Sequence, residues 1–436
     1  MGNYSPSLFL CIFHQILHIF CAFFHLISHI FPVIIGDTDR TKLLERRTTM
    51  HIYFDNAATT PLYPQVKEVM IKLLDEYGNA SALYSQGFRA SERLEKARYD
   101  IAQCIGAKPE EIYFTSGGSE SDTQALMTII NSSRSDGTII TSNIEHSAVL
   151  NTANRINNEY PHHNIILVPC NHRGFVKEVS LQKCFNNNKS GLVNTLVSIM
   201  MVNNEIGTIQ DIKELTKVAH WNKALMHTDA TQAMGHIPID VSDLNVDMLS
   251  ASAHKFHGPK GVGFLYCKSD ITPYNLICGG SQERGRRAGT ENVAGVVGMA
   301  EALKIATRRM EASIVYVTAL KKRIEDWASA NQLRNSIFFN TPRYCTAPGI
   351  LNISFVGLSG QEIQSMLNER NISISTGSAC HSGENKPSHV LQAIDNTPET
   401  LEGAIRISLS EMNTMQEVEM FLQELEAVIN ILTRYN

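Results

Sequence analysis

The sequence predicts an α/β protein with two parts, a large domain built on a mostly parallel seven-stranded sheet and a smaller α+β domain at the C-terminus. Short apolar runs recur between residues 112 and 266, and helical stretches separate several of them. Such runs are typical of parallel strands that are buried on both faces. A second mixture of strands and helices begins near residue 350. At 436 residues, the chain is also too long for one small core.

The elements are expected in the following order. A strand at 52–54 precedes a helix that Pro64 opens and a long helix at 85–105. Strands of the large sheet are expected at 112–115, 138–142, 165–169, 196–202, 225–229, 248–252 and 263–266. A long helical region covers 294–333. The C-terminal part is expected to contain strands at 350–355, 372–375 and 405–409 and helices near 360–369, 387–393 and 415–432.

These patterns predict the domain bounds. The large domain is expected at 65–310, and residues 50–64 are expected to join 311–436 in the small domain. Residues 1–49 form an apolar extension outside both. Residues 8–35 are long enough to span a bilayer, and the basic residues after them would leave the C-terminal body in the cytoplasm.

A second interpretation of this extension is simpler, and we favour it. The globular pattern begins abruptly at Met50, so residues 1–49 are then an upstream extension that the working protein does not carry. Four histidines in the apolar run are unfavourable in a helix that faces lipid. We therefore expect a cytoplasmic catalytic body, with a membrane as partner only if residues 8–35 form a real anchor.

Composition limits the partners. The chain has 38 Lys and Arg against 43 Asp and Glu, a net charge of −5, and it has no basic block. That balance argues against nucleic acid as the main partner. Nine cysteines are scattered without a CxxC pair, which is typical of a reduced compartment and leaves room for one reactive thiol.

The stretch from Ser250 to Gly263 is central to the functional interpretation. Small residues precede His254 and Lys255, and a Gly-rich turn follows them, directly after a predicted strand. A lysine in this setting can turn its amine into a cleft, where desolvation or a nearby cation lowers its pKa and makes it a nucleophile. We therefore hypothesise that Lys255 holds pyridoxal phosphate as a Schiff base. The alternative is a solvated loop lysine.

Other strand ends carry polar residues that would lie at the same edge of the sheet. Gly118 and Ser119 follow the strand at 112–115 and open a helix, which is a pattern typical of a phosphate cradle. The alternative is a capped helix, with Ser119 as N-cap and Asp122 three residues further on.

Two more strand ends fit a flat, charged ring. His146 is placed to stack on a ring or to relay a proton, although a lone His is more often a hydrogen-bonded surface or core residue. Asp229 ends an apolar strand, where a carboxylate is unfavourable unless a positive partner such as a pyridinium nitrogen meets it. The alternatives for Asp229 are an N-cap and an internal salt bridge.

The C-terminal part adds two candidates. Cys380 lies in a polar, Gly/Ser-rich segment that we expect to be a mobile loop, which suits a thiolate that must travel. Arg406 is a charge within an apolar strand pattern and suggests bidentate capture of a carboxylate. The alternatives are an incidental free cysteine and a structural ion pair. Zinc on His254 and His257 is another hypothesis, but that spacing suits a helix rather than a Gly-flanked loop.

Six motifs together resemble those of cysteine desulfurases, pyridoxal-phosphate enzymes of the class V aminotransferase group. They are YFDNAATTP (53–61), VNNEIG (202–207), DATQ (229–232), SAHKFHGPKG (252–261), RAGTEN (287–292) and GSAC (377–380). The resemblance runs in order from about residue 50 to the C-terminus. GSAC on a long loop looks like the branch that supplies sulfur for iron–sulfur clusters.

The resemblance implies the fold of type I pyridoxal-phosphate transferases and a role for each cofactor residue. Lys255 would form the aldimine, and His146 would stack on the ring and act as acid and base. Asp229 would pair with the ring nitrogen, and Gln232 would hydrogen-bond the phenolic oxygen. The residues that would hold the phosphate are Gly118, Ser119, Ser252 and His254.

The resemblance also implies substrate and partners. Thr290 would reach the phosphate of the neighbouring subunit, which implies a homodimer. Asn204 and Arg406 would bind the carboxylate of L-cysteine, and Cys380 would take its sulfur as a persulfide, leaving alanine. The persulfide would pass to a sulfur acceptor or iron–sulfur scaffold protein.

The chain departs from the family pattern at two places. Ser410 and Glu411 stand where the family often has Gly and Arg, and Gly118-Ser119 replaces the commoner small residue plus threonine. Two other functions stay open at this point: another pyridoxal-phosphate lyase, such as a selenocysteine lyase, and a non-catalytic scaffold for sulfur assembly.

Overall fold

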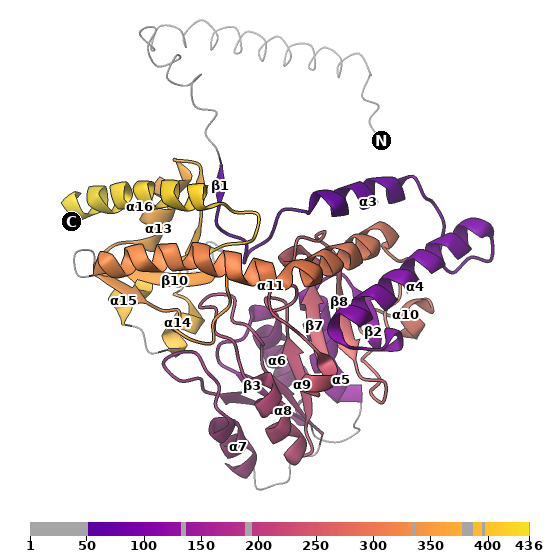
Figure 1. The fold of residues 1–436 in the computed structure, drawn as a ribbon. Helices are drawn as coiled ribbons and strands as arrows, with labels where there is room; N and C mark the ends of the chain where they lie inside the picture. The colour runs from indigo at the N-terminus through magenta and orange to yellow at the C-terminus, as the bar shows by residue number, and fades with distance from the viewer. Residues whose placement is uncertain are drawn as a thin grey trace, which may run out of the picture. The chain divides into compact units, whose positions relative to one another are not determined.

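The computed structural model describes residues 51–131, 137–187, 194–332, 336–376, 387–394 and 397–435 (Figure 1). Both interpretations of residues 1–49, and the prediction for Cys380, concern residues outside these ranges. Within them, no helix combines the length and the apolar character that crossing a lipid bilayer requires.

A seven-stranded sheet forms the centre of the large part, as the sequence predicts. Its strands lie in the order β2 (Ile112–Thr115), β8 (Gly263–Cys267), β7 (Met248–Ser252), β6 (Leu225–Asp229), β5 (Thr195–Ser198), β3 (Gly137–Ser142) and β4 (His163–Val168). β8 is antiparallel to both of its neighbours, and every other pair is parallel. The other strands therefore end at one common edge of the sheet.

β5 is shorter than the predicted strand at 196–202. Its ladder with β3 stops at Ser198, because the next free N–H, that of Met200, donates to the Glu145 carboxylate at 2.9 Å. Val202 then pairs with Ile209 as an isolated bridge. Residues 199–202 are apolar because they are buried, and this extended the predicted strand. Burial alone does not make a strand.

Helices cover the sheet. The helices between strands are α5 (Gly118–Asn131), α6 (Ser147–Glu159), α7 (Glu178–Asn187), α8 (Ile212–Trp221) and α9 (Val241–Leu244). A second group packs together: α3 (Pro64–Leu74), α4 (Ser85–Ile105) and α11 (Val293–Ala330). Pro64 opens α3, and Gly106 in the left-handed conformation ends α4. Short elements are η2 (Pro109–Glu111), η3 (Ala253–Lys255) and α10 (Gln282–Gly285).

The C-terminal part has its own sheet and core. β12 (Ser375–Thr376), β13 (Ala404–Ser408), β10 (Ile350–Phe355) and β9 (Ile337–Phe339) form an antiparallel sheet in that order. Its helices are α13 (Gly360–Asn368), α14 (His389–Ala393), α15 (Pro398–Glu402) and α16 (Met415–Tyr435). β1 (Ile52–Tyr53) pairs in parallel with β11 (Ile372–Ser373). The predicted strand at 372–375 is thus two strands in two sheets, with the buried Ile374 between them.

The two ends of α11 belong to different apolar clusters, and Figure 1 shows this helix running past both parts. Residues up to Ala302, Leu303 and Ile305 pack into the core of the large sheet, whereas Val317 and the residues after it pack with the C-terminal sheet. Ile52 and Phe54 belong to the second cluster. The predicted boundary at residue 310 falls between the two sets, and the domain bounds stay a prediction.

Candidate active site

A cleft of about 420 Å³ lies at the edge where the parallel strands end. The four residues assigned to the phosphate of the same subunit line it: Gly118, Ser119, Ser252 and His254. They come from the start of α5, the end of β7 and η3. The fold therefore brings together residues that are up to 136 positions apart, which local pattern alone could not guarantee.

The start of α5 suits an anion. The first N–H groups of a helix have no partner within it, and they point outward with the positive end of the helix dipole. A Cβ on Gly118 would lie 2.8 Å from the Thr231 Oγ1 atom, so a larger residue at this position would clash with Thr231. That Oγ1 atom is buried without a hydrogen-bond partner among the described residues. Ser119 is the second residue of α5 and is exposed.

The Lys255 amine lies between two backbone carbonyls. Its Nζ atom donates to the Ala57 oxygen at 2.6 Å and to the Ala58 oxygen at 2.8 Å. Burial and then the positive charge of Arg406 lower the pKa of Lys255 to about 8, while the charge of Asp229 opposes them. A much larger fraction of the amine is therefore neutral near neutral pH than in an ordinary lysine.

Asp229 and Gln232 lie beside this lysine. The Thr231 N–H donates to the Asp229 Oδ1 atom at 2.8 Å, and within the described part of the chain no lysine or arginine forms an ion pair with that carboxylate. Gln232 donates through Nε2 to the Ala57 oxygen at 2.8 Å, the same oxygen that accepts from Lys255. The structure thus places the amine, the amide and a buried carboxylate on neighbouring strand ends.

His254 and His146 have different surroundings. The Nδ1 atom of His254 lies 3.2 Å from the Thr59 hydroxyl, and burial followed by the charges of Lys255 and Lys260 lowers the pKa of His254 to about 4. His254 is therefore neutral and binds through hydrogen bonds. His146 is exposed ahead of α6, and its Nδ1 atom accepts the Ala148 N–H at 3.1 Å.

Arg406 is both ion-paired and incompletely satisfied. Its Nη2 atom donates to the Asp55 Oδ1 atom at 2.8 Å, and its Nη1 atom donates to the Asn204 backbone oxygen at 3.0 Å. Its Nε atom is buried and has no acceptor among the described residues. The structural ion pair that was the alternative interpretation exists, yet one donor of the guanidinium remains available for a further oxygen.

A single family accounts for this arrangement. Residues 52–421 match the model of the family described as Aminotransferase class-V. The chain belongs to the aminotransferase class-V family. The resemblance that the six motifs predicted is confirmed.

Relatives within the class-V family are closely similar. The chain is 41% identical over 388 residues to the cysteine desulfurase IscS of Dictyoglomus turgidum, covering 87% of this chain and 94% of that protein. Identity to the cysteine desulfurase IscS of Methanosarcina thermophila is 40% over 380 residues, with 87% and 92% covered. Both relatives are matched over nearly their whole length.

Solved structures agree with this. A NifS-like protein superposes with a TM-score of 0.80 at 37% identity, covering 88% of this chain and 100% of that one. The structure named "SspA in complex with cysteine" gives a TM-score of 0.69 at 34% identity, with 82% and 98% covered. The predicted fold class is confirmed.

The residues of this class-V chain fit the cofactor that the family implies. Pyridoxal phosphate needs an anion cradle, an amine and a carboxylate for the ring nitrogen. Gly118, which lines the cleft and packs closely against the unpartnered Thr231 hydroxyl, contributes to the cradle. The Lys255 amine and the Asp229 carboxylate supply the other two groups from adjacent strand ends.

Some predicted site residues are not brought together with the others. Thr290 is exposed and does not line the cleft. Asn204 contributes its backbone oxygen to Arg406. Cys380 lies outside the described residues. The zinc hypothesis gains no support, since His254 contacts Thr59 and His257 contacts the Pro61 oxygen. In the described residues, no group of three or more metal-ligating side chains gathers.

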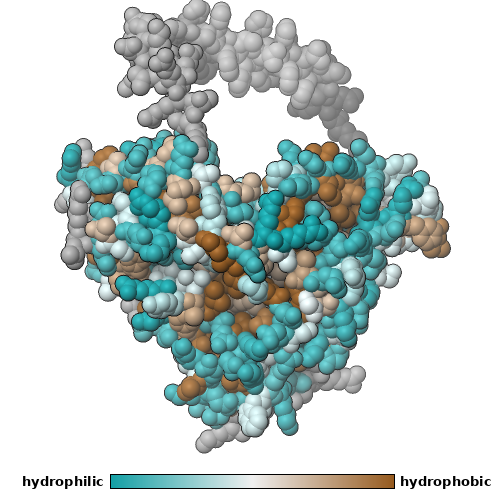
Figure 2. All heavy atoms as spheres, viewed as in Figure 1, coloured by the Kyte–Doolittle hydropathy of each residue, from teal (hydrophilic) through white to brown (hydrophobic). Residues whose placement is uncertain are grey.

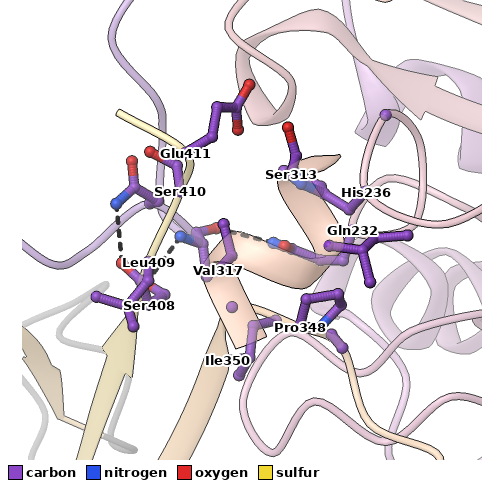
Figure 3. Close-up of a pocket in the computed structure, with 16 residues that line it drawn as sticks. Gln232, His236, Ser313, Val317, Pro348, Ile350, Ser408, Leu409, Ser410 and Glu411 are labelled. Atoms are coloured by element: carbon purple, nitrogen blue, oxygen red, sulfur yellow. Dashed lines mark hydrogen bonds between the residues drawn. The ribbon is translucent and has the colours of Figure 1, made fainter. Parts of the chain in front are cut away.

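The structure also contains a second, narrower cavity of about 40 Å³ (Figure 3). Gln232 reaches into it, Glu411 and Ser313 lie at one end, and Pro348 and Ile350 lie at the other. Asn56 and Ala57 line this cavity, whereas Ala58 and Thr59 line the cleft. Residues 56–59 therefore form a wall between the two spaces.

The structure adds two residues to the candidate site that the sequence did not single out. Lys260 lines the cleft, and its place in the turn Gly258-Pro259-Lys260-Gly261 was the available signal, a cation in a Gly-rich turn beside a phosphate cradle. Asp55 accepts a hydrogen bond from Arg406. It lies in the motif at 53–61, but its partner could not be identified from local sequence, because the two residues are 351 positions apart.

Proposed function

We propose that this protein is a cysteine desulfurase. It removes sulfur from L-cysteine, gives L-alanine, and holds the sulfur as a persulfide that passes to an acceptor for iron–sulfur clusters. The observation that carries the proposal is the Lys255 amine, whose lowered pKa makes it reactive beside a phosphate cradle. The similarity over nearly whole chains to proteins named cysteine desulfurase supports the substrate.

The cofactor in this proposal is pyridoxal 5'-phosphate. Lys255 would hold its aldehyde carbon, and Asp229 and Gln232 would hold the ring. Residues for the phosphate are Gly118, Ser119, Ser252 and His254, with Thr290 from the neighbouring subunit. When bound, the cofactor supplies an electron sink for the carbon from which a proton is removed.

Lys255 has a second role as the base. With the substrate held beside it, the neutral form of the Lys255 amine would take the α-proton at Nζ. Burial and the charge of Arg406 favour this neutral form. His146, exposed at the start of α6, is proposed to cover the ring and to carry protons to the substrate.

Arg406 orients the substrate. Its Nε atom has no acceptor among the described residues, so a carboxylate oxygen can satisfy it beside the Nη2 atom that already meets Asp55. Asn204, whose backbone oxygen accepts from Arg406, is proposed to bind the same carboxylate. This contact fixes which face of the substrate meets Lys255.

The sulfur step needs a second nucleophile. The Cys380 thiolate forms a bond to the substrate sulfur, and the carbon–sulfur bond breaks with its electron pair remaining on carbon. A proton then completes the methyl group of alanine. Cys380 carries the sulfur as a persulfide, so no external oxidant or reductant is required.

We propose a homodimer in which α3 and the start of α4 contribute to the interface. Side chains of the segment from α3 to the start of α4 are apolar and exposed: Ile71, Leu74, Tyr77, Leu83, Tyr84 and Phe88. Figure 2 shows apolar surface over this end of the molecule. Exposed apolar side chains that gather on one segment favour a contact surface. The protein is also proposed to be located in the cytoplasm. Its proposed large domain covers residues 65–310, and its proposed small domain combines residues 50–64 with 311–436.

Purification and a visible spectrum test the proposal. The wild-type protein is expected to be yellow and to form alanine and sulfide from L-cysteine with a thiol reductant. The Cys380→Ser variant is expected to keep the colour and lose sulfide release. Its matched control is Cys278→Ser, a change at a cysteine that is exposed in the described part of the chain and should have no effect. A yellow protein that acts only on selenocysteine, or on neither substrate, contradicts the proposal.

A further inference from the structure

Two buried acids lie behind the strand ends of the cleft, and the proposed reaction uses neither. Asp122 is on the inner face of α5 and is 1% exposed, and Glu145 follows β3 and is 0% exposed. Asp229, the proposed partner of the ring nitrogen, is the third acid of this region. For catalysis, the question is whether Asp122 or Asp229 carries the negative charge.

Asp122 lacks the surroundings of an anion. Its Oδ1 atom is buried and has no hydrogen-bond donor within the described part of the chain. The closest basic group is the His227 Nε2 atom at 3.7 Å, which already lies 2.9 Å from the Ser250 hydroxyl. The other ring nitrogen, Nδ1, lies 2.9 Å from the Ser198 hydroxyl.

His227 supplies no positive charge to this region. It is fully buried, and burial lowers its pKa to about 4. With its two nitrogens hydrogen-bonded to hydroxyls, the ring is satisfied as a neutral imidazole. An ionised Asp122 would therefore be a buried charge without a positive group beside it, which is strongly unfavourable.

Asp229 differs from Asp122 in the contacts of its oxygens. Its Oδ1 atom accepts the Thr231 N–H at 2.8 Å, a hydrogen bond that favours the charged form. Two acids in one buried region separate into one that ionises and one that keeps its proton. The hydrogen bonds assign the charge to Asp229 and the proton to Asp122.

We propose that Asp122 keeps its proton in the native protein and is a positioning residue, because it leaves Asp229 as the anion that faces the ring nitrogen. The part about the ring rests on the proposed function. The groups that face Asp122 are Asp229 from β6 and Glu145 from the segment after β3, both acidic, and the neutral His227. Burial and then the charge of Asp229 raise the pKa of Asp122, against a hydrogen bond from Ser250.

The same substitution, Asp to Asn, made separately at Asp229 and at Asp122 tests the charge assignment in the enzyme with its cofactor. A negative charge near the ring stabilises the protonated cofactor, so its removal lowers the midpoint pH of the visible absorption band. The Asp229→Asn variant should lower that midpoint by about one unit or more, or lose the cofactor. The Asp122→Asn variant should leave it within a few tenths of a unit. A fall like that of Asp229→Asn overturns the proposal.

Two measurements on the apoprotein test the proposal without the proposed activity. The infrared spectrum should contain a band of un-ionised carboxylic acid that Asp122→Asn removes, with Glu145→Gln as the control for the other buried acid. A native state that holds an extra proton loses stability as pH rises. The melting temperature of Asp122→Asn should therefore increase relative to wild type between about pH 5 and pH 8. The smaller Asp122→Ser variant repeats the test if the amide does not fit. A constant difference with an unchanged infrared band overturns the proposal even if desulfurase activity is present.

Discussion

Among the described residues, two lysines that are at least partly buried have lowered pKa values, and one of them, Lys255, lies beside the cleft. Lys255 donates to the carbonyls of Ala57 and Ala58, and Lys321 on α11 donates to the Thr346 hydroxyl at 3.0 Å and the Ala347 oxygen at 2.8 Å. Burial is the largest cause of the lowered pKa in both. By this measure alone the two amines are alike.

Their neighbours differ. Arg406 adds a second positive charge near Lys255, whereas the charge that acts on Lys321 is that of Glu325, which opposes the shift. Lys255 is next to His254, which lines the cleft with the phosphate cradle, whereas Lys321 ties the segment at 346–347 to α11. A lowered lysine pKa therefore identifies a site only when a cavity and a charged neighbour accompany it.

The largest effect is expected for Lys255→Ala. The variant lacks both the group that holds the cofactor and the proposed base, so alanine formation from cysteine should fall by roughly 10³-fold or more. The yellow colour should also be lost, whereas the folded structure should persist because the amine lies at the cleft wall. A variant that retains its colour and its rate would contradict both roles assigned to Lys255, and the two lysines would then not differ in function.

Arg406→Gln should weaken substrate binding. The loss of a hydrogen bond to a charged group predicts an increase in KM for cysteine of about 10- to 150-fold. The same change removes the cation that helps to lower the pKa of Lys255, so that pKa should rise toward its usual value. Steady-state kinetics across pH measure both effects.

The matched control is Arg323→Gln, which removes a more exposed arginine that pairs with Glu419. It should change neither KM nor the pH profile. An equal effect of the two arginine substitutions would contradict the role assigned to Arg406.

The reactivity of the Lys255 amine should depend on pH differently from that of an ordinary lysine. Only the neutral amine reacts with an aldehyde, and the pKa of Lys255 is about 8. The rate at which apoprotein takes up pyridoxal phosphate should therefore rise with pH to a midpoint near that value, well below that of an ordinary lysine. Stopped-flow absorbance measures the rate, and Lys255→Ala, which keeps Lys321, gives the background. A midpoint near that of an ordinary lysine contradicts the role of burial and Arg406.

The smallest effect is expected for Lys321→Met. The change leaves the Ala347 oxygen and the Thr346 hydroxyl without this donor, which predicts a loss of about 1–3 kcal/mol in the free energy of unfolding. Denaturant unfolding measures the loss, while kcat and KM for cysteine should not change. The neighbouring exposed Lys322→Met is the control and should lie within about 0.5 kcal/mol of wild type. A loss of activity in Lys321→Met would show that the second lysine also serves the site.

The large sheet and most of the cleft could be predicted from the sequence because their signals are local. Each strand is a short apolar run, and each polar group of the edge ends such a run or comes shortly after it, as Asp229 and Gly118 do. Parallel strands in a sheet bring such ends together whatever their separation along the chain. The predicted family resemblance agrees with the comparisons over the same residues.

The remaining features depend on contacts between distant residues. Asp122 has the spacing of a capping residue in the sequence, and only the packing of α5 on the sheet makes it a buried acid. Lys321 looks like any lysine of a long helix until Thr346 and Ala347 cover it. The division of residues 372–375 between two sheets follows from pairing with β1 and β13, which the run of residues does not encode. The role of Cys380 stays a prediction.

The Ala57 carbonyl oxygen has a consequence for how easily the catalytic amine can depart. Two donors share it, Lys255 at 2.6 Å and Gln232 at 2.8 Å. When the lysine swings away, Gln232 still occupies that oxygen, and the exposed Ala58 oxygen can take a water molecule in its place. Movement of the lysine therefore leaves no buried carbonyl oxygen without a hydrogen-bond donor, and residues 56–59 can stay in place while the amine moves.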